Sequence, residues 1–303
     1  MTSTHSALPD PRNADVRIYV NGEYFSRDQA RVSVFDSAFN VGDGIWEGMR
    51  LHRGKITFLD RHLDRFFEAV EVTGIDPGLD RHGLTELLHD VLRINGMTNG
   101  AHLRLMVSRG TKSTPSQHPS NLISGATIVV IPEYKTANPA AAATGVALHT
   151  SSVRRPPPNT LDQRLNTHSK LHEVLALREA VAAGADEALM LDINGNVATC
   201  NATHFFMVAD GAVWTSTGEH CLHGITRAVV IDLCRGDDVP IHLADFTPEA
   251  ARSADEAFVT GTFGGLTPVR SIDGAGFEPI PGPMTIRLQR LYLAAVDTEV
   301  AGG

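Results

Sequence analysis

A break in the hydrophobic patterning near the middle of the chain most constrains its fold. Residues 133–145 contain Asn138-Pro139 followed by a run of alanines, and neither helical nor strand periodicity continues through them. Strand and helix patterns occur on both sides, and 303 residues are enough for two cores. We therefore predict a first domain over residues 15–133, a linker over 134–145 and a second domain over 146–303. Residues 1–14, which are polar and contain proline, are predicted to form a mobile tail.

The first domain combines hairpins with amphipathic helices. Asn21-Gly22 lies between two strand-like segments and is typical of a type I′ turn. Helices are expected over residues 60–74 and 81–95, and apolar strands over residues 102–108 and 126–131. Hairpin-linked strands beside grouped helices favour an α+β domain.

The second domain begins with a strand over residues 146–153 and continues with a helix over residues 169–183. This helix is expected to bury an apolar stripe formed by Val174, Leu175, Leu177 and Ala180. Ile193-Asn194-Gly195 marks a further hairpin, and strands are expected over residues 205–208 and 212–215.

The overall charge and the cysteine content exclude several classes of function. The formal net charge of −9 comes without a basic run, which argues against nucleic-acid binding. No apolar run is long enough to span a membrane. Cys200, Cys221 and Cys234 show no metal-like spacing, so we expect reduced thiols in a cytoplasmic protein and no metal site.

Three segments carry features of an anion-binding site. Gly224 precedes an apolar helix, so the amides of Ile225 and Thr226 would face an anion at the helix N-terminus. Thr262 lies in a glycine-rich turn of a kind that can hold an anion. Arg65 follows His62 by one helical turn and can pair with a phosphate. Each segment is equally compatible with an ordinary helix start, turn or surface arginine.

Taken in order, these segments resemble those of fold-type IV pyridoxal-phosphate (PLP) enzymes, the class IV aminotransferases. Asp36, Val41-Gly42-Asp43-Gly44 and Glu47 are similar to the family's N-terminal signature, and His62 to Arg65 to its phosphate-binding arginine segment. Gly224 to Arg227 and Thr260 to Thr262 are similar to its two other phosphate contacts.

The resemblance covers the chain from about Asn21 to the last helix. It implies the two-domain α/β architecture of the D-amino-acid and branched-chain aminotransferases. It also implies PLP bound between the domains, a small-molecule substrate and a homodimer.

The chain departs from the family at residues that handle the cofactor. Asn166 stands where the family has its Schiff-base lysine, and an amide cannot form that bond. Thr199, which Cys200 follows beside the cofactor position, replaces the glutamate that keeps the pyridine nitrogen protonated. His204 replaces an asparagine or similar polar residue. We therefore expect a weaker electron sink than in the family.

Lys170, four residues after Asn166, is the candidate replacement for the missing lysine. In branched-chain relatives this region carries a tyrosine that reaches the cofactor's phenolic oxygen, so a lysine here would approach the reactive carbon from another direction. The alternative is a solvent-facing lysine in the first turn of a helix. His168, His172 and Glu173 are either acid–base groups beside it or structural residues.

Three functions are compatible with these residues. The first is an aminotransferase-like enzyme that acts on a small amino acid, amine or keto acid and uses Lys170. The second is a PLP-dependent lyase or isomerase without transamination, and the third is a PLP-independent protein that holds a phosphorylated metabolite. For the substrate, Trp46 either lines the pocket or packs in the core. Lys112 and His118 either bind a carboxylate or are solvated loop residues.

Overall fold

The computed structural model describes residue 4 and residues 7–302, and the chain within them divides into two compact units. One unit contains Pro9–Thr136 and Leu165–Ser169, and we call it the N-terminal unit. The other contains Ala137–Arg164 and Lys170–Ala301, with the segment that ends at Leu8, and we call it the C-terminal unit. The division at Thr136 lies within the predicted linker. The transfer of residues 165–169 to the N-terminal unit differs from the prediction.

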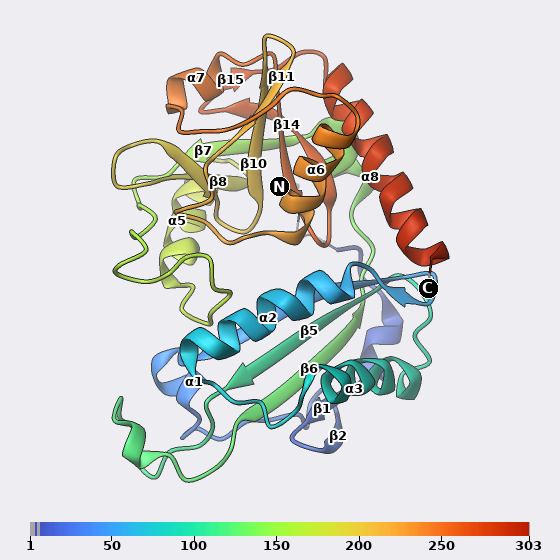
Figure 1. Cartoon of the computed structure of the whole chain (residues 1–303), viewed down its shortest axis with the longest axis vertical. Helices are drawn as coiled ribbons and strands as arrows, with labels where there is room; N and C mark the ends of the chain where they lie inside the picture. The colour runs from blue at the N-terminus through green and yellow to red at the C-terminus, as the bar shows by residue number, and fades with distance from the viewer. Residues whose placement is uncertain (1–3, 5–6, 303) are drawn as a thin grey trace. The chain divides into compact units, whose positions relative to one another are not determined.

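The N-terminal unit is built on one antiparallel sheet in the order β2-β1-β6-β5-β3-β4. Its elements are β1 (Arg17–Val20), β2 (Glu23–Ser26), α1 (Ser37–Val41), β3 (Gly44–His52), β4 (Lys55–Ile56), α2 (Leu59–Thr73), α3 (Arg81–Ile94), β5 (Ala101–Ser108) and β6 (Thr127–Tyr134). Figure 1 shows α2 and α3 beside this sheet. Asn21 and Gly22 have φ angles of 48° and 98°, which confirms the predicted type I′ turn.

The C-terminal unit has a nine-stranded sheet in the order β12-β11-β10-β13-β14-β7-β8-β9, with β15 paired to β14. Its strands are β7 (Val146–Thr150), β8 (Glu187–Leu191), β9 (Val197–Cys200), β10 (His204–Ala209), β11 (Ala212–Thr215), β12 (Ile241–Leu243), β13 (Glu256–Gly261), β14 (Gly265–Ile272) and β15 (Ala275–Gly276). Its helices are α4 (Pro139–Thr144), α5 (Leu171–Ala182), α6 (Ile225–Gly236), α7 (Pro248–Arg252) and α8 (Pro283–Ala301). Because β9 also approaches β10, the sheet curls around an apolar core that contains Leu189, Phe205 and Val259.

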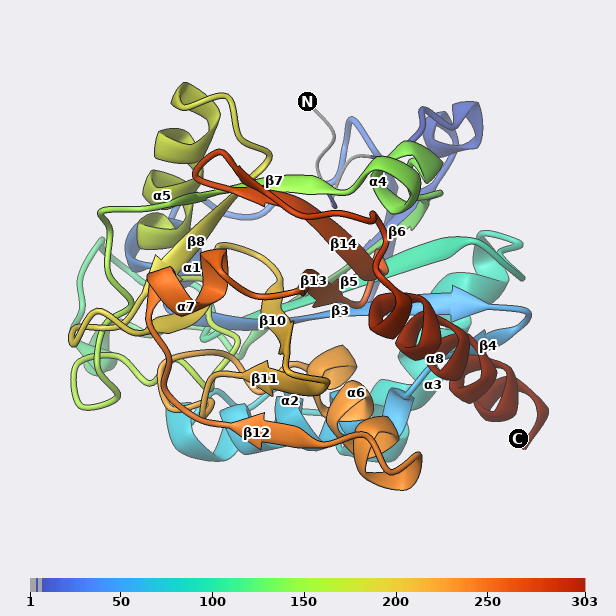
Figure 2. The same ribbon diagram turned by 90° about the horizontal axis from the view of Figure 1, so that it is seen from above.

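Helices cover the outside of this curled sheet. Figure 2 shows α5 beside β7 and β8, and α6 beside β10 and β11. A second core joins α6 and α8 to the sheet and contains Phe206, Val230 and Leu288. Side chains of β10 and β13 therefore alternate between the inner core and the face covered by α6.

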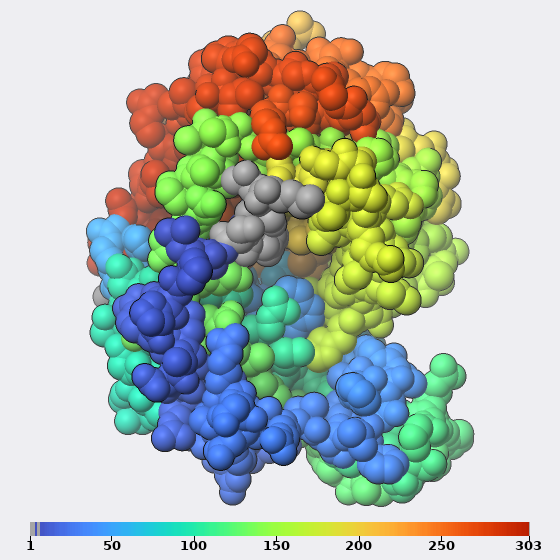
Figure 3. All heavy atoms as spheres, turned by 180° about the vertical axis from the view of Figure 1, so that it is seen from behind, coloured from blue at the N-terminus to red at the C-terminus, as the bar shows by residue number. Residues whose placement is uncertain are grey.

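The predicted apolar stripe of α5 is confirmed at Ala180 but is wrong for Val174 and Leu175. Val174 and Leu175 are exposed, and the buried side chains of α5 are Ala176 and Ala180. These alanines pack against Ala188 on β8, so the helix lies close to the sheet and leaves no room for larger side chains. Figure 3 shows α5, in yellow-green, at the surface.

Two segments predicted to lack structure contain short helices. Residues 1–3 and 5–6 of the predicted tail lie outside the described residues, but Pro11–Ala14 form the 3-10 helix η1, capped by Asp10. In the predicted linker, Pro139–Thr144 form α4, which Asn138 caps and which packs on β14. Proline at the first helical position and an N-cap side chain suffice to start both helices.

Candidate functional site

The N-terminus of α6 has the properties of an anion site. Gly224 is the N-cap residue and offers no side chain to the first amides. The Ala228 amide donates to the Gly224 carbonyl, 2.9 Å away, so the amides of Ile225 and Thr226 precede the first hydrogen bond inside the helix. Both residues are buried. Amides and a helix dipole at one buried point favour a negatively charged ligand.

A polar pair of residues adjoins this helix terminus. On β10 and β13, Phe206 stacks on Phe258 with ring centroids 5.0 Å apart, and both pack in the core that contains α6. On the same face of the two strands, His204 lies two residues before Phe206 and is paired with Thr260, which lies two residues after Phe258. Thr260 is 0% exposed, and its hydroxyl has no hydrogen-bond partner among the residues that the structure describes. A buried hydroxyl of this kind is expected to bind a ligand or ordered water.

Thr262 lies two residues beyond Thr260, in the turn between β13 and β14. It is half-buried, and the turn ends at Gly265, whose φ of 63° is left-handed. The C-terminal unit therefore contains the predicted residues Ile225, Thr226 and Thr262. Thr260 was not predicted as a site residue. Its position two residues after Phe258 in an apolar strand indicates that its hydroxyl lies on the same buried face.

Thr199 and Cys200 lie on β9 and are both buried. Thr199 Oγ1 donates to the Thr203 carbonyl oxygen at 2.9 Å and lies 3.4 Å from His204 Nδ1. Because its one proton is already donated, this hydroxyl cannot also donate to a ring nitrogen. Burial, with the charge of Glu187, raises the pKa of the Cys200 thiol well above its ordinary value, so Cys200 is a neutral structural thiol.

Lys170 is the N-cap residue of α5 and belongs to a charged cluster in the C-terminal unit. Its Nζ lies 3.4 Å from Glu173 Oε1, which also accepts a hydrogen bond from Arg155 Nη1 at 2.5 Å. Arg155 is 2% exposed and also donates to the His220 carbonyl at 3.0 Å. Lys170 is therefore not simply solvent-facing. It shares a carboxylate with a buried arginine that was not predicted as a site residue.

His172 lies in the same cluster, 3.1 Å from Gln163 Oε1 and 3.3 Å from Arg155 Nη1. Burial lowers the pKa of His172 from 6.5, and the charges of Arg155 and Lys170 add to this against the opposing charge of Glu173. His172 is therefore neutral at physiological pH.

In the N-terminal unit, Arg65 is held by a carboxylate. Glu47 on β3 accepts from Arg65 Nε and Nη2 on α2, and from His62 Nδ1 at 2.7 Å. All three side chains are buried. The spacing of His62 and Arg65 places both on the face of α2 that packs on β3.

Asn166 lies in a short segment that pairs with the start of β3. Its carbonyl accepts from the Trp46 amide at 2.9 Å, and the His168 amide donates to the Gly44 carbonyl at 2.8 Å. Asn166 is 3% exposed, and within the described part of the chain its side-chain oxygen Oδ1 has no hydrogen-bond partner. Asn166 thus offers a buried oxygen acceptor to a ligand or an ordered water.

The predicted substrate residues have other contacts in the structure. The indole of Trp46 donates to the Thr167 carbonyl at 3.1 Å, and Arg104 lies 4.3 Å over its ring. Lys112 is 2% exposed and donates to the Ser116 carbonyl at 2.6 Å, so the expectation of a solvated side chain is wrong for this residue. His118 is exposed and caps η2 (Pro119–Asn121) through Nδ1.

The structure distributes the predicted residues over both units. Thr199, Cys200, Lys170, Ile225, Thr226 and Thr262 belong to the C-terminal unit, and Trp46, Arg65, Lys112, His118, Asn166 and His168 to the N-terminal unit. Within the C-terminal unit, His204 joins Thr199 to the N-terminus of α6. Within the N-terminal unit, the segment that carries Asn166 and His168 lies against β3, which also carries Glu47.

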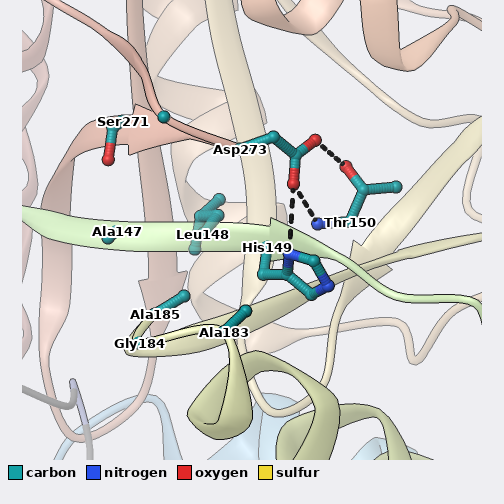
Figure 4. A pocket seen from close by; sticks show the side chains of 10 residues that line it. Ala147, Leu148, His149, Thr150, Ala183, Gly184, Ala185, Ser271 and Asp273 are labelled. Carbon is teal, nitrogen blue, oxygen red and sulfur yellow. Dashed lines mark hydrogen bonds and ion pairs between the residues drawn. The ribbon is translucent and has the colours of Figure 1, made fainter.

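A separate pocket of about 660 Å³ lies in the C-terminal unit and contains none of the predicted site residues. Figure 4 shows Asp273 in it, which accepts from the amide and hydroxyl of Thr150. His149 Nδ1 lies 3.4 Å from the same carboxylate. These contacts tie the turn between β14 and β15 to β7.

The described residues include no group of three or more histidine, cysteine or acidic side chains that could hold a metal ion. Within the same part of the chain, every helix is too short or too polar to cross a lipid bilayer.

Comparisons with known proteins identify the family. The family model for amino-transferase class IV matches residues 44–272. A branched-chain-amino-acid aminotransferase-like protein of Arabidopsis thaliana is 37% identical over 295 residues, which cover 96% of this chain and 52% of that protein. The chain thus spans about half the length of this relative.

Two further relatives match over most of their length. A putative branched-chain-amino-acid aminotransferase of Methanocaldococcus jannaschii is 32% identical, over 86% of this chain and 88% of that protein. The structure of a T.th. branched-chain amino acid aminotransferase with pyridoxamine 5'-phosphate matches with a TM-score of 0.87 and 30% identity, over 94% and 95% of the two chains. The two-unit architecture is thus that of fold-type IV PLP enzymes, and the chain belongs to the class IV aminotransferase family.

Proposed function

We propose that the protein binds PLP or its amine form, pyridoxamine 5'-phosphate, and acts as an aminotransferase-like enzyme on a small amino acid, amine or keto acid. The observation that carries this proposal is the N-terminus of α6, where buried amides and the unused hydroxyl of Thr260 lie together. These groups fit a phosphate, and Ile225, Thr226 and Thr262 would hold it. The T.th. relative was solved with pyridoxamine 5'-phosphate, which supports the same ligand here.

The cofactor, when bound, supplies an electron-withdrawing ring and a carbon that exchanges amine for carbonyl. Thr199 supplies no proton to the ring nitrogen, because its hydroxyl donates to the Thr203 carbonyl. Asn166 Oδ1 is a buried acceptor and suits a ligand amine, which donates hydrogen bonds. The chain therefore offers groups for the amine form of the ligand at the position where the family offers a nucleophile.

Lys170 is our candidate for a covalent anchor. It pairs with Glu173, and a carboxylate partner favours the ammonium form, which is not nucleophilic. For Lys170 to bond covalently to the cofactor, its ion pair with Glu173 must break. Glu173 would then remain paired with Arg155, which is its closer partner at 2.5 Å. We also propose His168, in the segment beside β3, as an acid–base residue.

Borohydride reduction followed by peptide mapping tests the anchor. The sequence has four lysines, Lys55, Lys112, Lys135 and Lys170, so a reduced adduct is assigned without ambiguity. We expect the adduct on Lys170, its loss in Lys170→Ala and its retention in Lys55→Ala. An adduct on another lysine refutes the anchor, and protein that binds pyridoxamine 5'-phosphate without any adduct with PLP establishes a noncovalent site.

Keto-acid-dependent amine transfer then separates an aminotransferase from a lyase or isomerase. The neutral Thr199 at the position of the family's glutamate favours the second class, because a less protonated ring stabilises a carbanion less. Absence of binding to either cofactor form, with retained binding of phosphorylated metabolites, would establish the third function.

We also propose a homodimer in the cytoplasm. In the N-terminal unit, the segment before α1, α1 itself and the loop after β5 expose Val34, Phe39 and Ile123, which are 66%, 71% and 67% exposed. The Lys112 amide joins this loop to the Phe35 carbonyl, and Figure 3 shows the two segments, in blue and green, side by side. An apolar patch of this kind favours a protein partner, here a second copy. The three cysteines are unpaired, which suits a reducing compartment.

A further inference from the structure

His204 occupies the place that a capping side chain of α6 would fill. Gly224, the N-cap residue, has φ −64° and ψ 133°, a conformation that any residue adopts. A Cβ at this position would overlap His204 Nε2 and would lie 3.2 Å from Cε1. An N-cap side chain normally accepts hydrogen bonds from amides two or three residues further along the helix. Nε2 therefore stands where the first turn of α6 needs an acceptor.

The other ring nitrogen fixes the tautomer of His204. Nδ1 faces Thr199 Oγ1 at 3.4 Å, and the proton of that hydroxyl is donated to the Thr203 carbonyl. Oγ1 can then only accept from His204, so Nδ1 carries a proton. In the neutral imidazole, Nε2 is consequently an acceptor and suits the helix amides.

Other ionisable groups on the surrounding elements include Glu187 on β8, Cys200 on β9, Glu256 on β13, and His223 in the loop before α6; α6 itself carries Arg227, Asp232, Cys234 and Arg235. Glu187 accepts from the Thr203 hydroxyl at 2.6 Å, and Arg227 donates to the Ser216 carbonyl at 2.6 Å. The Cys200 thiol is neutral. An anion on α6 would therefore bring new negative charge directly to the His204 ring.

We propose that a phosphate bound at the N-terminus of α6 is accompanied by protonation of His204. The phosphate takes the helix amides as donors and repels the lone pair of Nε2, whereas an imidazolium donates Nε2–H to a phosphate oxygen. The proton comes from solvent, and His204 becomes a ligand of the anion. This inference rests on the phosphate site of the proposed function and adds His204 to the groups that would hold the anion.

Calorimetric titration with pyridoxamine 5'-phosphate, which cannot bond to lysine, measures the proton directly. At pH 7.5, in two buffers of different ionisation enthalpy, we expect roughly one proton to be taken up per site, because the neutral ring becomes an imidazolium on binding. His204→Asn should bind without uptake. Its affinity should fall about tenfold at pH 6.5 and little at pH 9, because the lost hydrogen bond is charge-assisted only when the ring is protonated.

Wild-type binding without proton uptake, or undiminished uptake in His204→Asn, would overturn the inference and leave the proposed function standing. Wild-type protein that binds neither pyridoxamine 5'-phosphate nor inorganic phosphate would remove both. Should the variant not fold, ¹⁵N spectra of the wild type decide the matter. One histidine must then change its Nε2 signal from an unprotonated to a protonated nitrogen on binding, and an unchanged histidine set would refute the inference.

Discussion

Glu47 on β3 and Arg65 on α2 form a bidentate ion pair, in which Nε donates to Oε1 at 2.8 Å and Nη2 donates to Oε2 at 2.7 Å. Burial acts to raise the pKa of Glu47, but the charge of Arg65 and the hydrogen bonds from His62 and Arg65 hold it below its ordinary value of 4.5. A buried carboxylate that stays charged fixes the guanidinium in one orientation. The Arg65 side chain, which is predicted from the sequence to pair with a phosphate, is thus held in one orientation by Glu47.

Glu47→Gln should therefore destabilise the protein by about 3–5 kcal/mol at pH 7, because it leaves the Arg65 charge buried without a carboxylate. Urea unfolding measures this loss. Glu133→Gln is the control, since Glu133 makes a 3.5 Å surface pair with Arg27 and its loss should cost at most about 1 kcal/mol.

The same pair predicts how stability depends on pH. The pKa of Glu47 is lower in the folded protein than its ordinary value of 4.5. The contribution of ionised Glu47 to the stability of the fold is therefore complete above pH 4.5 and is lost as the pH falls through the folded pKa. The stability difference between wild type and Glu47→Gln should be constant from pH 7 down to about pH 5 and should shrink below it. A difference that grows on acidification would contradict the sign of the shift.

Gly224→Ser tests the position of His204. Serine is a better N-cap than glycine by a few tenths of a kcal/mol, but its Cβ would overlap the imidazole, so we expect a net loss of about 1–3 kcal/mol. In a His204→Ala background the overlap is removed, and the same change should be neutral or stabilising. Additive effects of the two substitutions in thermal unfolding would refute the contact.

Glu173→Ala should cost about 3–5 kcal/mol, because Arg155 is 2% exposed and would lose its carboxylate partner. Lys170→Ala removes the longer, partly exposed contact to Glu173, and this loss should cost at most about 1 kcal/mol. Equal losses in the two variants would show that Lys170, and not Arg155, is the main partner of Glu173.

Ellman's reagent should leave the native protein essentially unlabelled at pH 8. Burial raises the pKa of Cys221 and Cys200, and that of Cys234 to about 11, and the thiolate is the reactive form. Unfolding in guanidinium should release all three thiols. Rapid reaction of one thiol in the native state would show a mobile or open element around it.

Phe39→Glu should shift the proposed dimer to a monomer in analytical ultracentrifugation, because a charge at the centre of an apolar interface is not solvated. Val72→Glu, at a residue of α2 that is 62% exposed, is the control and should leave the sedimentation unchanged. A wild-type monomer at micromolar concentration would refute the dimer itself.

Elements with strong local signals were predictable from the sequence. The helices expected over residues 60–74 and 81–95 are α2 and α3, and the strand expected over residues 102–108 is β5. Their periodicity and caps are local properties, so no knowledge of the partner elements is needed. The apolar stripe of α5 failed at Val174 and Leu175 because a local pattern does not reveal how closely a helix approaches its sheet.

The candidate site was predictable only in its local parts. Gly224 and the first amides of α6 are adjacent in the sequence, so the N-terminus of this helix could be located from the local sequence alone. The pairs Glu47–Arg65 and Arg155–Glu173 join residues 18 positions apart, from different elements, and depend on how those elements pack. The contact of His204 with Gly224 depends likewise on the packing of β10 against α6.

The assignment of Leu165–Ser169 to the N-terminal unit, between flanks that belong to the C-terminal unit, has a practical consequence. Neither unit can be produced as one uninterrupted fragment. A fragment that starts at residue 137 would carry Asn166 away from Trp46 and β3, its hydrogen-bonding partners. A fragment that ends at residue 136 would leave the start of β3 without that pairing. The separate contributions of the N-terminal and C-terminal units to ligand binding must therefore be measured in the intact chain.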